Sequence, residues 1–98
     1  MASERALLFT DVIDSTRLTE RLGDSLAAEL WIAHDRKARE LLAHYSVREI
    51  DRTDGFFLVF DRVGDAASFA LEYHSVLSEL GMEARAGLHV GLVMLREN

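Results

Sequence analysis

Cysteine and proline are both absent from this chain of 98 residues, and its six glycines never stand next to one another. Without cysteine, the chain can form neither disulfides nor a cysteine-ligated zinc site, and residence in the cytoplasm is the simplest expectation. Without proline-rich, glycine-rich or repetitive stretches, it contains no linker at which two domains could be joined. We therefore expect residues 1–98 to form one domain with a single hydrophobic core.

Long apolar runs and an excess of positive charge are also missing. No stretch approaches the roughly 18 consecutive apolar residues that indicate a membrane span, and the first residues lack the apolar core of a signal peptide. The formal net charge of −6 argues against a nucleic-acid partner, because no basic cluster is present to bind phosphates. It does not exclude a single nucleotide, which can arrive with divalent metal ions held by acidic residues.

Hydrophobic periodicity predicts four strands and three helices. The strands are expected at Leu7–Phe9, Ser46–Arg52, Phe56–Phe60 and Arg85–Val93. The helices are expected at Ser15–Leu22, Asp24–Tyr45 and Asp65–Leu80. Asp14 or Ser15 should cap the short helix, and Gly23 and Gly81 should end the first and third helices. The second strand carries charges between its apolar residues, which is typical of an edge strand with a bulge.

With the short helix set aside, the order strand, helix, strand, strand, helix, strand predicts an α+β fold of the ferredoxin-like βαββαβ type. In this arrangement a four-stranded antiparallel sheet has the order 4-1-3-2, and both long helices cover one face. The two purest apolar runs, Leu7–Phe9 and Phe56–Phe60, fall on the central strands. In the last strand, the apolar even-numbered residues are expected to pack on the helices, and the odd-numbered ones are small or polar.

The same arrangement brings two distant aspartates together. Asp11 ends the first strand, and Asp54 lies in the Asp-Gly turn just before the third strand, which is its antiparallel neighbour. Two carboxylates that converge at the end of a strand pair suit hard divalent cations. Each aspartate also has a simpler interpretation, because Asp11 can merely end a strand and Asp54 can merely supply the turn.

Three blocks of the sequence resemble the class III adenylyl and guanylyl cyclase domain, in that family's order and spacing. The first block is Leu8-Phe9-Thr10-Asp11-Val12-Ile13-Asp14-Ser15-Thr16-Arg17-Leu18, continuing to Glu20-Arg21-Leu22-Gly23-Asp24. The second block is Thr53-Asp54-Gly55-Phe56 with Phe60, and the third is Arg85-Ala86-Gly87-Leu88-His89-Val90-Gly91. Together the blocks span nearly the whole chain.

The resemblance implies a nucleotidyl cyclase palm that forms a head-to-tail dimer, with itself or with another cyclase domain, and has nucleotide sites at the interface. It implies that Asp11, Asp54 and the backbone carbonyl of Ile13 bind two Mg²⁺ or Mn²⁺ ions. The triphosphate of ATP or GTP would lie against the backbone of Val12, Ile13, Asp14, Ser15 and Thr16. The implied reaction is attack of the ribose 3′ oxygen on the α-phosphate, which gives pyrophosphate and a 3′,5′-cyclic nucleotide for signal transduction.

Three departures from the family pattern define a second hypothesis. Thr53 replaces the usual glycine before the second aspartate, and Ile50 stands where adenylyl cyclases place the lysine that reads adenine, unless a shifted strand brings in Arg52. The family's asparagine and arginine, which act on the ribose and the phosphates, lie beyond the last matched strand. The resemblance therefore implies an incomplete catalyst, and the alternative is a non-catalytic dimerisation or sensory module with the same fold.

The face of the sheet opposite the helices is predicted to be apolar. If Phe56, Leu58 and Phe60 point toward the helices, then Phe57 and Val59 point away from them. Leu7 and Phe9 should lie beside them, on the same face. Monomers rarely expose such a patch, so we expect another chain to cover it.

Overall fold

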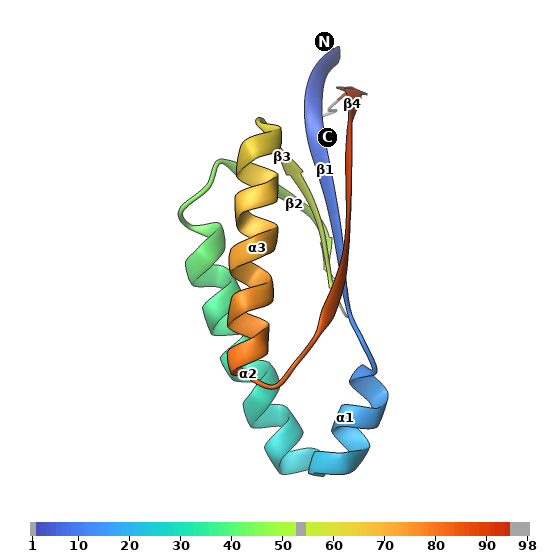
Figure 1. The fold of residues 1–98 in the computed structure, drawn as a ribbon, viewed down its shortest axis with the longest axis vertical. Coiled ribbons are helices and arrows are strands. Elements are labelled where there is room, and N and C mark those ends of the chain that lie inside the picture. The colour runs from blue at the N-terminus through green and yellow to red at the C-terminus, as the bar shows by residue number, and fades with distance from the viewer. Residues whose placement is uncertain (1, 53–54, 95–98) are drawn as a thin grey trace.

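The computed structural model describes residues 2–52 and 55–94. Its strands are β1 (Ala2–Val12), β2 (Val47–Arg52), β3 (Phe56–Phe60) and β4 (Ala84–Met94). Its helices are α1 (Ser15–Leu22), α2 (Asp24–Leu42) and α3 (Val63–Glu79). The two long helices, α2 and α3, lie side by side on one face of the sheet, and α1 lies beyond the end of β1 (Figure 1).

The strands pair in the order β2-β3-β1-β4, and all three pairs are antiparallel. This order confirms the predicted α+β, ferredoxin-like arrangement, with the first and third strands at the centre of the sheet. Leu8 on β1 lies directly opposite Leu58 on β3 and Leu88 on β4. The predicted bulge is also present, because the register of β2 shifts between Glu49 and Asp51.

The hydrophobic core lies between the sheet and the two long helices. Even-numbered side chains of β1 and β3 point into it, and α3 contributes Phe69, Tyr73 and Leu77 at helical spacing. The rings of Phe69 and Tyr73 stack with centroids 5.6 Å apart, and the Phe60 ring lies 5.8 Å from that of Phe69. Burying one such large apolar side chain stabilises a fold by about 1.5–3 kcal/mol. The packing energy of the chain is therefore concentrated on the helix-covered face of the sheet.

One polar pair is buried inside this layer. His34 on α2 is 4% exposed, and its Nε2 lies 2.7 Å from the hydroxyl oxygen of the fully buried Tyr73. Its Nδ1 lies 3.0 Å from a carboxylate oxygen of Asp35. A carboxylate only accepts hydrogen bonds, so in the neutral ring Nδ1 carries the proton and Nε2 accepts from the Tyr73 hydroxyl. His34 is therefore part of the packed core.

Several element boundaries differ from the prediction. β1 and β4 are longer than expected because they pair with each other over eleven residues each. α2 ends at Leu42 rather than Tyr45, yet the Tyr45 ring still packs on core aromatic rings from the turn that follows. α3 begins at Val63 rather than Asp65. A stripe of apolar residues at helical spacing thus indicates which side chains are buried more reliably than where a helix ends.

The even-numbered residues of β4 are less covered than predicted. Leu88 and Val90 lie on the helix side, directly opposite Leu8 and Ala6, yet each is 44% exposed. β3 pairs with β1 only as far as Ala6, and beyond that point β1 and β4 continue as a two-stranded ribbon past the ends of the helices (Figure 1). Leu92, on this ribbon, is 78% exposed. The alternation in β4 therefore predicts correctly which of its residues face the helix side of the sheet. The prediction that these residues pack on the helices is wrong.

The opposite face of the sheet has no helix over it within the described residues (Figure 1). On this face the Phe9 and Phe57 rings stack with centroids 4.3 Å apart, and Phe9 is 48% exposed. Leu7 and Phe57 are partly exposed, whereas Val59 is buried. The predicted apolar patch is therefore present but narrower than expected. We refer to Leu7, Phe9 and Phe57 as the open-face patch.

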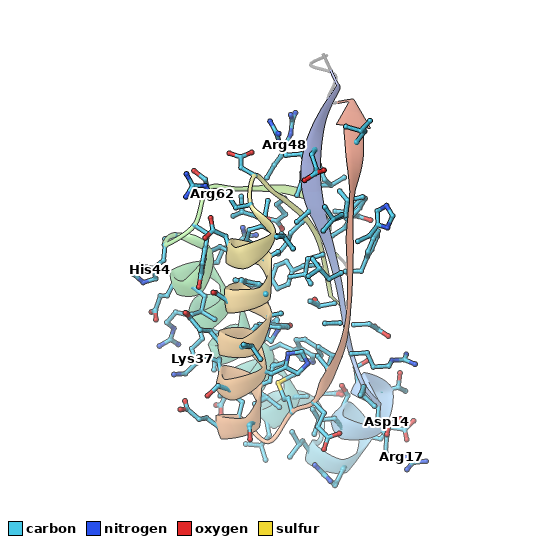
Figure 2. The ribbon with its side chains drawn as sticks, turned by 45° about the horizontal axis from the view of Figure 1, so that its top comes forward. Asp14, Arg17, Lys37, His44, Arg48 and Arg62 are labelled. Atoms are coloured by element: carbon cyan, nitrogen blue, oxygen red, sulfur yellow. The ribbon has the colours of Figure 1, made fainter. Side chains whose placement is uncertain are left out.

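Charged side chains such as Arg36, Arg39 and Glu40 lie on the exposed surface of α2. Figure 2 shows Lys37 and His44 pointing away from the sheet, on the outer side of α2 and just after it. No helix in the described ranges combines the length and the apolar character needed to cross a bilayer.

Candidate functional site

The first candidate residue, Asp11, stands near the end of β1 with its side chain on the open face. It lies directly opposite Arg85 on β4, and a guanidinium nitrogen of Arg85 is 2.9 Å from its Oδ2. The two side chains are 54% and 75% exposed, and an ion pair in such a setting contributes only about 0–1 kcal/mol to stability. The Asp11 carboxylate is therefore accessible, and a bound metal ion could take the place of the guanidinium.

The backbone of β3 approaches Asp11 closely. The amide of Phe56 donates a hydrogen bond of 2.9 Å to the buried hydroxyl of Thr10. A Cβ atom on Gly55 would lie only 1.7 Å from the Thr10 carbonyl oxygen and 2.9 Å from the Cα of Asp11. Glycine is therefore required here, because any side chain would displace one of the two strands. The residue that follows Asp54 in the sequence thus packs directly on the backbone beside Asp11.

Asp54 and Thr53 lie outside the described residues, and so does the side chain of Arg52. The roles predicted for Asp54 as a metal ligand and for Arg52 as a base-reading residue remain predictions. Within residues 2–52 and 55–94, no three histidine, aspartate or glutamate side chains are grouped so that they could hold a metal ion. The second carboxylate of the predicted site, that of Asp54, stays a prediction.

The turn from β1 into α1 leaves backbone groups available. Asp14 has left-handed dihedral angles, φ 55° and ψ 36°, which aspartate and asparagine tolerate better than most residues. It stands at the predicted N-cap position, but its side chain makes no capping hydrogen bond. The amides of the first helical turn are thus not capped by this side chain, and such amides are donors for an anion. This turn contains Ser15 and Thr16, two of the predicted nucleotide-binding residues.

The oxygen atoms near Asp11 match the ligands that hard divalent cations prefer. The Ile13 amide donates a hydrogen bond of 2.8 Å to the Glu83 carbonyl, but within the described chain the Ile13 carbonyl accepts none. Asp11 adds one exposed carboxylate. Mg²⁺ is usually held by one or two carboxylates, with water and substrate phosphates completing its shell. These two residues therefore fit one part of the predicted metal site.

The sequence pattern alone does not single out Arg85 or Thr10 as site residues. Arg85 is merely one of the polar odd-numbered positions of the last strand, and its contact with Asp11 depends on the register between β4 and β1. An alignment of the two strands as antiparallel partners could have revealed this contact. Thr10 reads as an ordinary strand residue, and nothing in the sequence indicates that its hydroxyl binds the Phe56 amide.

Comparisons with known proteins identify the fold. No protein-family model matches the chain, and no curated protein matches it in sequence. A bacterial light-regulated adenylyl cyclase superposes with a TM-score of 0.80 at 18% identity, over 96% of this chain and 56% of that one. An adenylate cyclase from Trypanosoma brucei in its monomeric state gives 0.83 at 19% identity, over 97% and 59%. The guanylate cyclase domain of RhGC from Catenaria anguillulae, in complex with GTP, gives 0.68 at 17% identity, over 93% and 58%.

The chain therefore has the fold of the class III adenylyl and guanylyl cyclase domains, and the resemblance noted in its sequence is confirmed at the level of the fold. It spans between 56% and 59% of the length of these three structures. At such low sequence identity, a common fold does not by itself establish a common activity.

Proposed function

We propose that this chain is the metal- and nucleotide-binding part of a nucleotidyl cyclase domain. It acts in the cytoplasm on ATP or GTP, and the product is a 3′,5′-cyclic nucleotide that carries a signal. The observation that carries this proposal is the position of Asp11. Its exposed carboxylate stands, on a cyclase fold, beside the point where Gly55 packs on β1. The sequence pattern predicts that Asp54, the residue before Gly55, supplies the second carboxylate.

The proposed roles follow from the groups around this point. The chemistry that two bound Mg²⁺ or Mn²⁺ ions supply is activation of the attacking ribose oxygen and neutralisation of the leaving phosphate. Asp11 and Asp54 would hold the metal ions through carboxylates, and Ile13 through its backbone carbonyl. The backbone of Val12–Thr16 would lie along the triphosphate, with amides at the start of α1 as donors. Arg52 would approach the base.

Arg85 acquires a role that the sequence alone did not suggest. When no cation is bound, its guanidinium neutralises Asp11 across 2.9 Å. When the Asp11 carboxylate turns to a divalent cation, Arg85 loses this partner and becomes free to bind a phosphate oxygen. Arg85 would in this way link the binding of metal to the binding of the anionic nucleotide.

The proposed partner is a second copy of the chain or another cyclase domain. The open-face patch supports this, because a stacked pair of aromatic rings of which one, Phe9, stays half exposed is an anchor suited to a protein interface. The chain spans less than three-fifths of each of the three structures compared above. We therefore propose that turnover also needs groups from further chain or from a partner.

Calorimetric titration of the 98-residue chain with Mn²⁺ and a nucleoside triphosphate tests the proposal. Asp11→Asn and Asp54→Asn should each weaken metal-dependent nucleotide binding by about tenfold or more, a loss of at least about 1.4 kcal/mol. Each should leave the circular dichroism spectrum unchanged. Asp14→Asn is the matched control, because it removes a neighbouring carboxylate that makes no capping bond, and asparagine tolerates the same backbone conformation.

The same titration separates the two functional hypotheses. If Asp11→Asn or Asp54→Asn binds Mn²⁺ and nucleotide as tightly as the parent chain, the proposal of a two-metal site fails. The alternative, a non-catalytic dimerisation or sensory module, predicts no metal-dependent nucleotide binding by the parent chain. Both hypotheses expect association through the open-face patch, so sedimentation velocity tests the partner and not the chemistry.

A further inference from the structure

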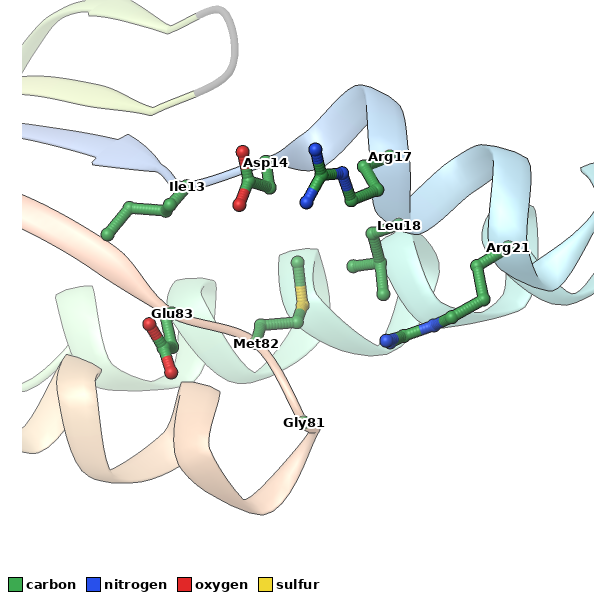
Figure 3. Close-up of a pocket in the computed structure, with 8 residues that line it drawn as sticks. All are labelled: Ile13, Asp14, Arg17, Leu18, Arg21, Gly81, Met82 and Glu83. Carbon is green, nitrogen blue, oxygen red and sulfur yellow. The ribbon is translucent and has the colours of Figure 1, made fainter.

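A pocket that does not include Asp11 lies between α1 and the turn that joins α3 to β4 (Figure 3). Its volume is about 290 Å³, close to the lower limit of the range of about 300–1,000 Å³ typical of small-molecule sites. Ile13 forms part of the wall where the chain leaves β1, and Met82 and Glu83 enter from the segment before β4. The pocket thus adjoins the proposed metal site without using its carboxylate, and its size suits a small ligand.

Charges of both signs line this pocket. Arg17 and Arg21 stand one helical turn apart on the same side of α1. Asp14 and Glu83 contribute two carboxylates from the segments on either side of the pocket. Within the described chain, none of these four side chains forms a salt bridge or a hydrogen bond. The lining therefore carries two cations and two anions that do not neutralise one another by direct contact.

Apolar side chains separate the charges. Figure 3 shows the Glu83 carboxylate at one end of the pocket and the Arg21 guanidinium at the other, with Met82 and Leu18 between them. Met82 is buried and belongs to the hydrophobic core, so the floor of the pocket is fixed in place. The surface seen by a ligand is thus negative at one end, apolar in the middle and positive at the other end.

We propose that this pocket binds a small zwitterion with an apolar stem, of the ω-amino carboxylate class. The ligand's carboxylate would bind the guanidinium groups of Arg21 and Arg17, and its ammonium group would bind Glu83, both through charge-assisted hydrogen bonds. Its methylene groups would cover Leu18 and Met82. A simple anion or a simple cation can make only one of these two charge-assisted contacts, so we expect it to bind more weakly.

Binding of defined probes to the 98-residue chain tests this proposal without metal or nucleotide, so it stands or falls separately from the proposed function. The probes are 4-aminobutyrate, 6-aminohexanoate and 8-aminooctanoate, compared with hexanoate and hexylammonium and followed by NMR chemical-shift titration at low ionic strength. At least one amino carboxylate should bind saturably, and about tenfold more tightly than either singly charged probe. No saturable binding by any of the three, or binding no tighter than hexanoate, would overturn the proposal.

Two pairs of variants assign the ends of the ligand. Arg21→Gln should weaken binding of the amino carboxylate, whereas Arg36→Gln, on the exposed surface of α2, should leave it unchanged. Glu83→Gln should reduce the affinity of the amino carboxylate to that of hexanoate, whereas Glu20→Gln, on α1 but outside the pocket lining, should not. Equal effects of a pocket variant and its control would show that only overall charge matters, and would reject the site.

Discussion

Leu8 and Phe9 are neighbours in β1, but their side chains point to opposite faces of the sheet. Leu8 is fully buried beneath the long helices, in the layer that contains Phe60, Phe69 and Tyr73. Phe9 stacks on Phe57 and stays half exposed on the open face. One side of this central strand is therefore covered by helices of the same chain. No helix covers its other side within the described residues.

From this difference we expect the stability of the fold to depend on the covered face and the proposed binding to depend on the open face. The helix-covered face carries most of the buried apolar side chains, together with a buried hydrogen-bonded pair of side chains, His34 with Tyr73. The open face carries a stacked aromatic pair and an exposed ion pair, Asp11 with Arg85. The ion pair contributes little to folding. Substitutions on the first face should change unfolding, and substitutions on the second should change association and ligand binding.

The largest contrast is expected between two phenylalanines. Phe69→Ala should destabilise the chain by about 3–5 kcal/mol, because it leaves a cavity between α3 and the sheet. Phe9→Ala should cost about 1 kcal/mol or less, since it removes one cross-strand pair at the surface, and it should lower self-association. Urea unfolding followed by circular dichroism gives both free energies. Equal costs for the two substitutions would show that the open face is as important for folding as the covered one.

Two glycines provide the next contrast. Gly55→Ala would push a Cβ atom to 1.7 Å from the Thr10 carbonyl oxygen, so a loss of about 3 kcal/mol or more is expected as β3 shifts away from β1. A Cβ atom on Gly87, on the edge strand β4 opposite Phe9, would meet nothing within 4 Å, and Gly87→Ala should change stability by less than about 0.5 kcal/mol. Unfolding free energies of the two variants, compared at the same pH, test this. A tolerated Gly55→Ala would contradict the close approach of the two strands.

A polar pair on each face gives a smaller contrast. Tyr73→Phe removes the hydroxyl that lies 2.7 Å from the buried His34, and it should cost about 1–3 kcal/mol because a buried ring nitrogen loses this bond. Arg85→Gln breaks the exposed pair with Asp11 and should cost less than about 1 kcal/mol. Thermal unfolding of both variants would show the difference. A larger loss for Arg85→Gln would mean that the ion pair supports the sheet itself.

The smallest expected effect concerns Tyr45, at the border of the covered face. Partial burial raises the pKa of Tyr45 above its usual value of 10.0, and the hydrogen bond to Glu72 and the charges of Glu72 and Asp65 raise it further. Because the folded-state pKa is the higher one, this stabilisation is complete below pH 10.0 and is lost as pH rises through the folded-state pKa. Urea midpoints between about pH 8 and 11 should fall less in Glu72→Gln than in the parent chain. Identical pH profiles would contradict this coupling.

The topology and the layout of the two faces were predictable from the sequence, because both follow from where apolar residues recur. The pure apolar runs mark the central strands, and the alternation of β3 correctly assigns Phe57 to the open face. The extent to which the helices cover the sheet was not predictable in the same way. Whether Leu88 and Leu92 are buried depends on how far the helices reach along β4, and the sequence of β4 contains no information on that distance.

The candidate site, too, has one part that the sequence predicts and another part that it does not. Asp11 could be identified as a candidate site residue, because an aspartate at the end of an apolar strand conflicts with strand propensity. Its contact with Arg85 does not follow from the pattern of either strand alone, because it depends on the register between residues 74 positions apart in the chain. The Asp14 backbone conformation was also not predictable, since an aspartate before a helix more often signals an ordinary N-cap.

The pairing of β1 with β4 also affects how the chain must be made. β1 is the first strand to leave the ribosome, and its partner on one side, β3, is complete once Phe60 has been added. Its partner on the other side pairs residue by residue back to Ala2 and is complete only at Met94. The 34 residues from Asp61 to Met94 take roughly 2–7 s to synthesise. For that time the central strand of the nascent sheet has one unpaired edge, and a chaperone or a neighbouring nascent chain can reach it before its own partner has been translated.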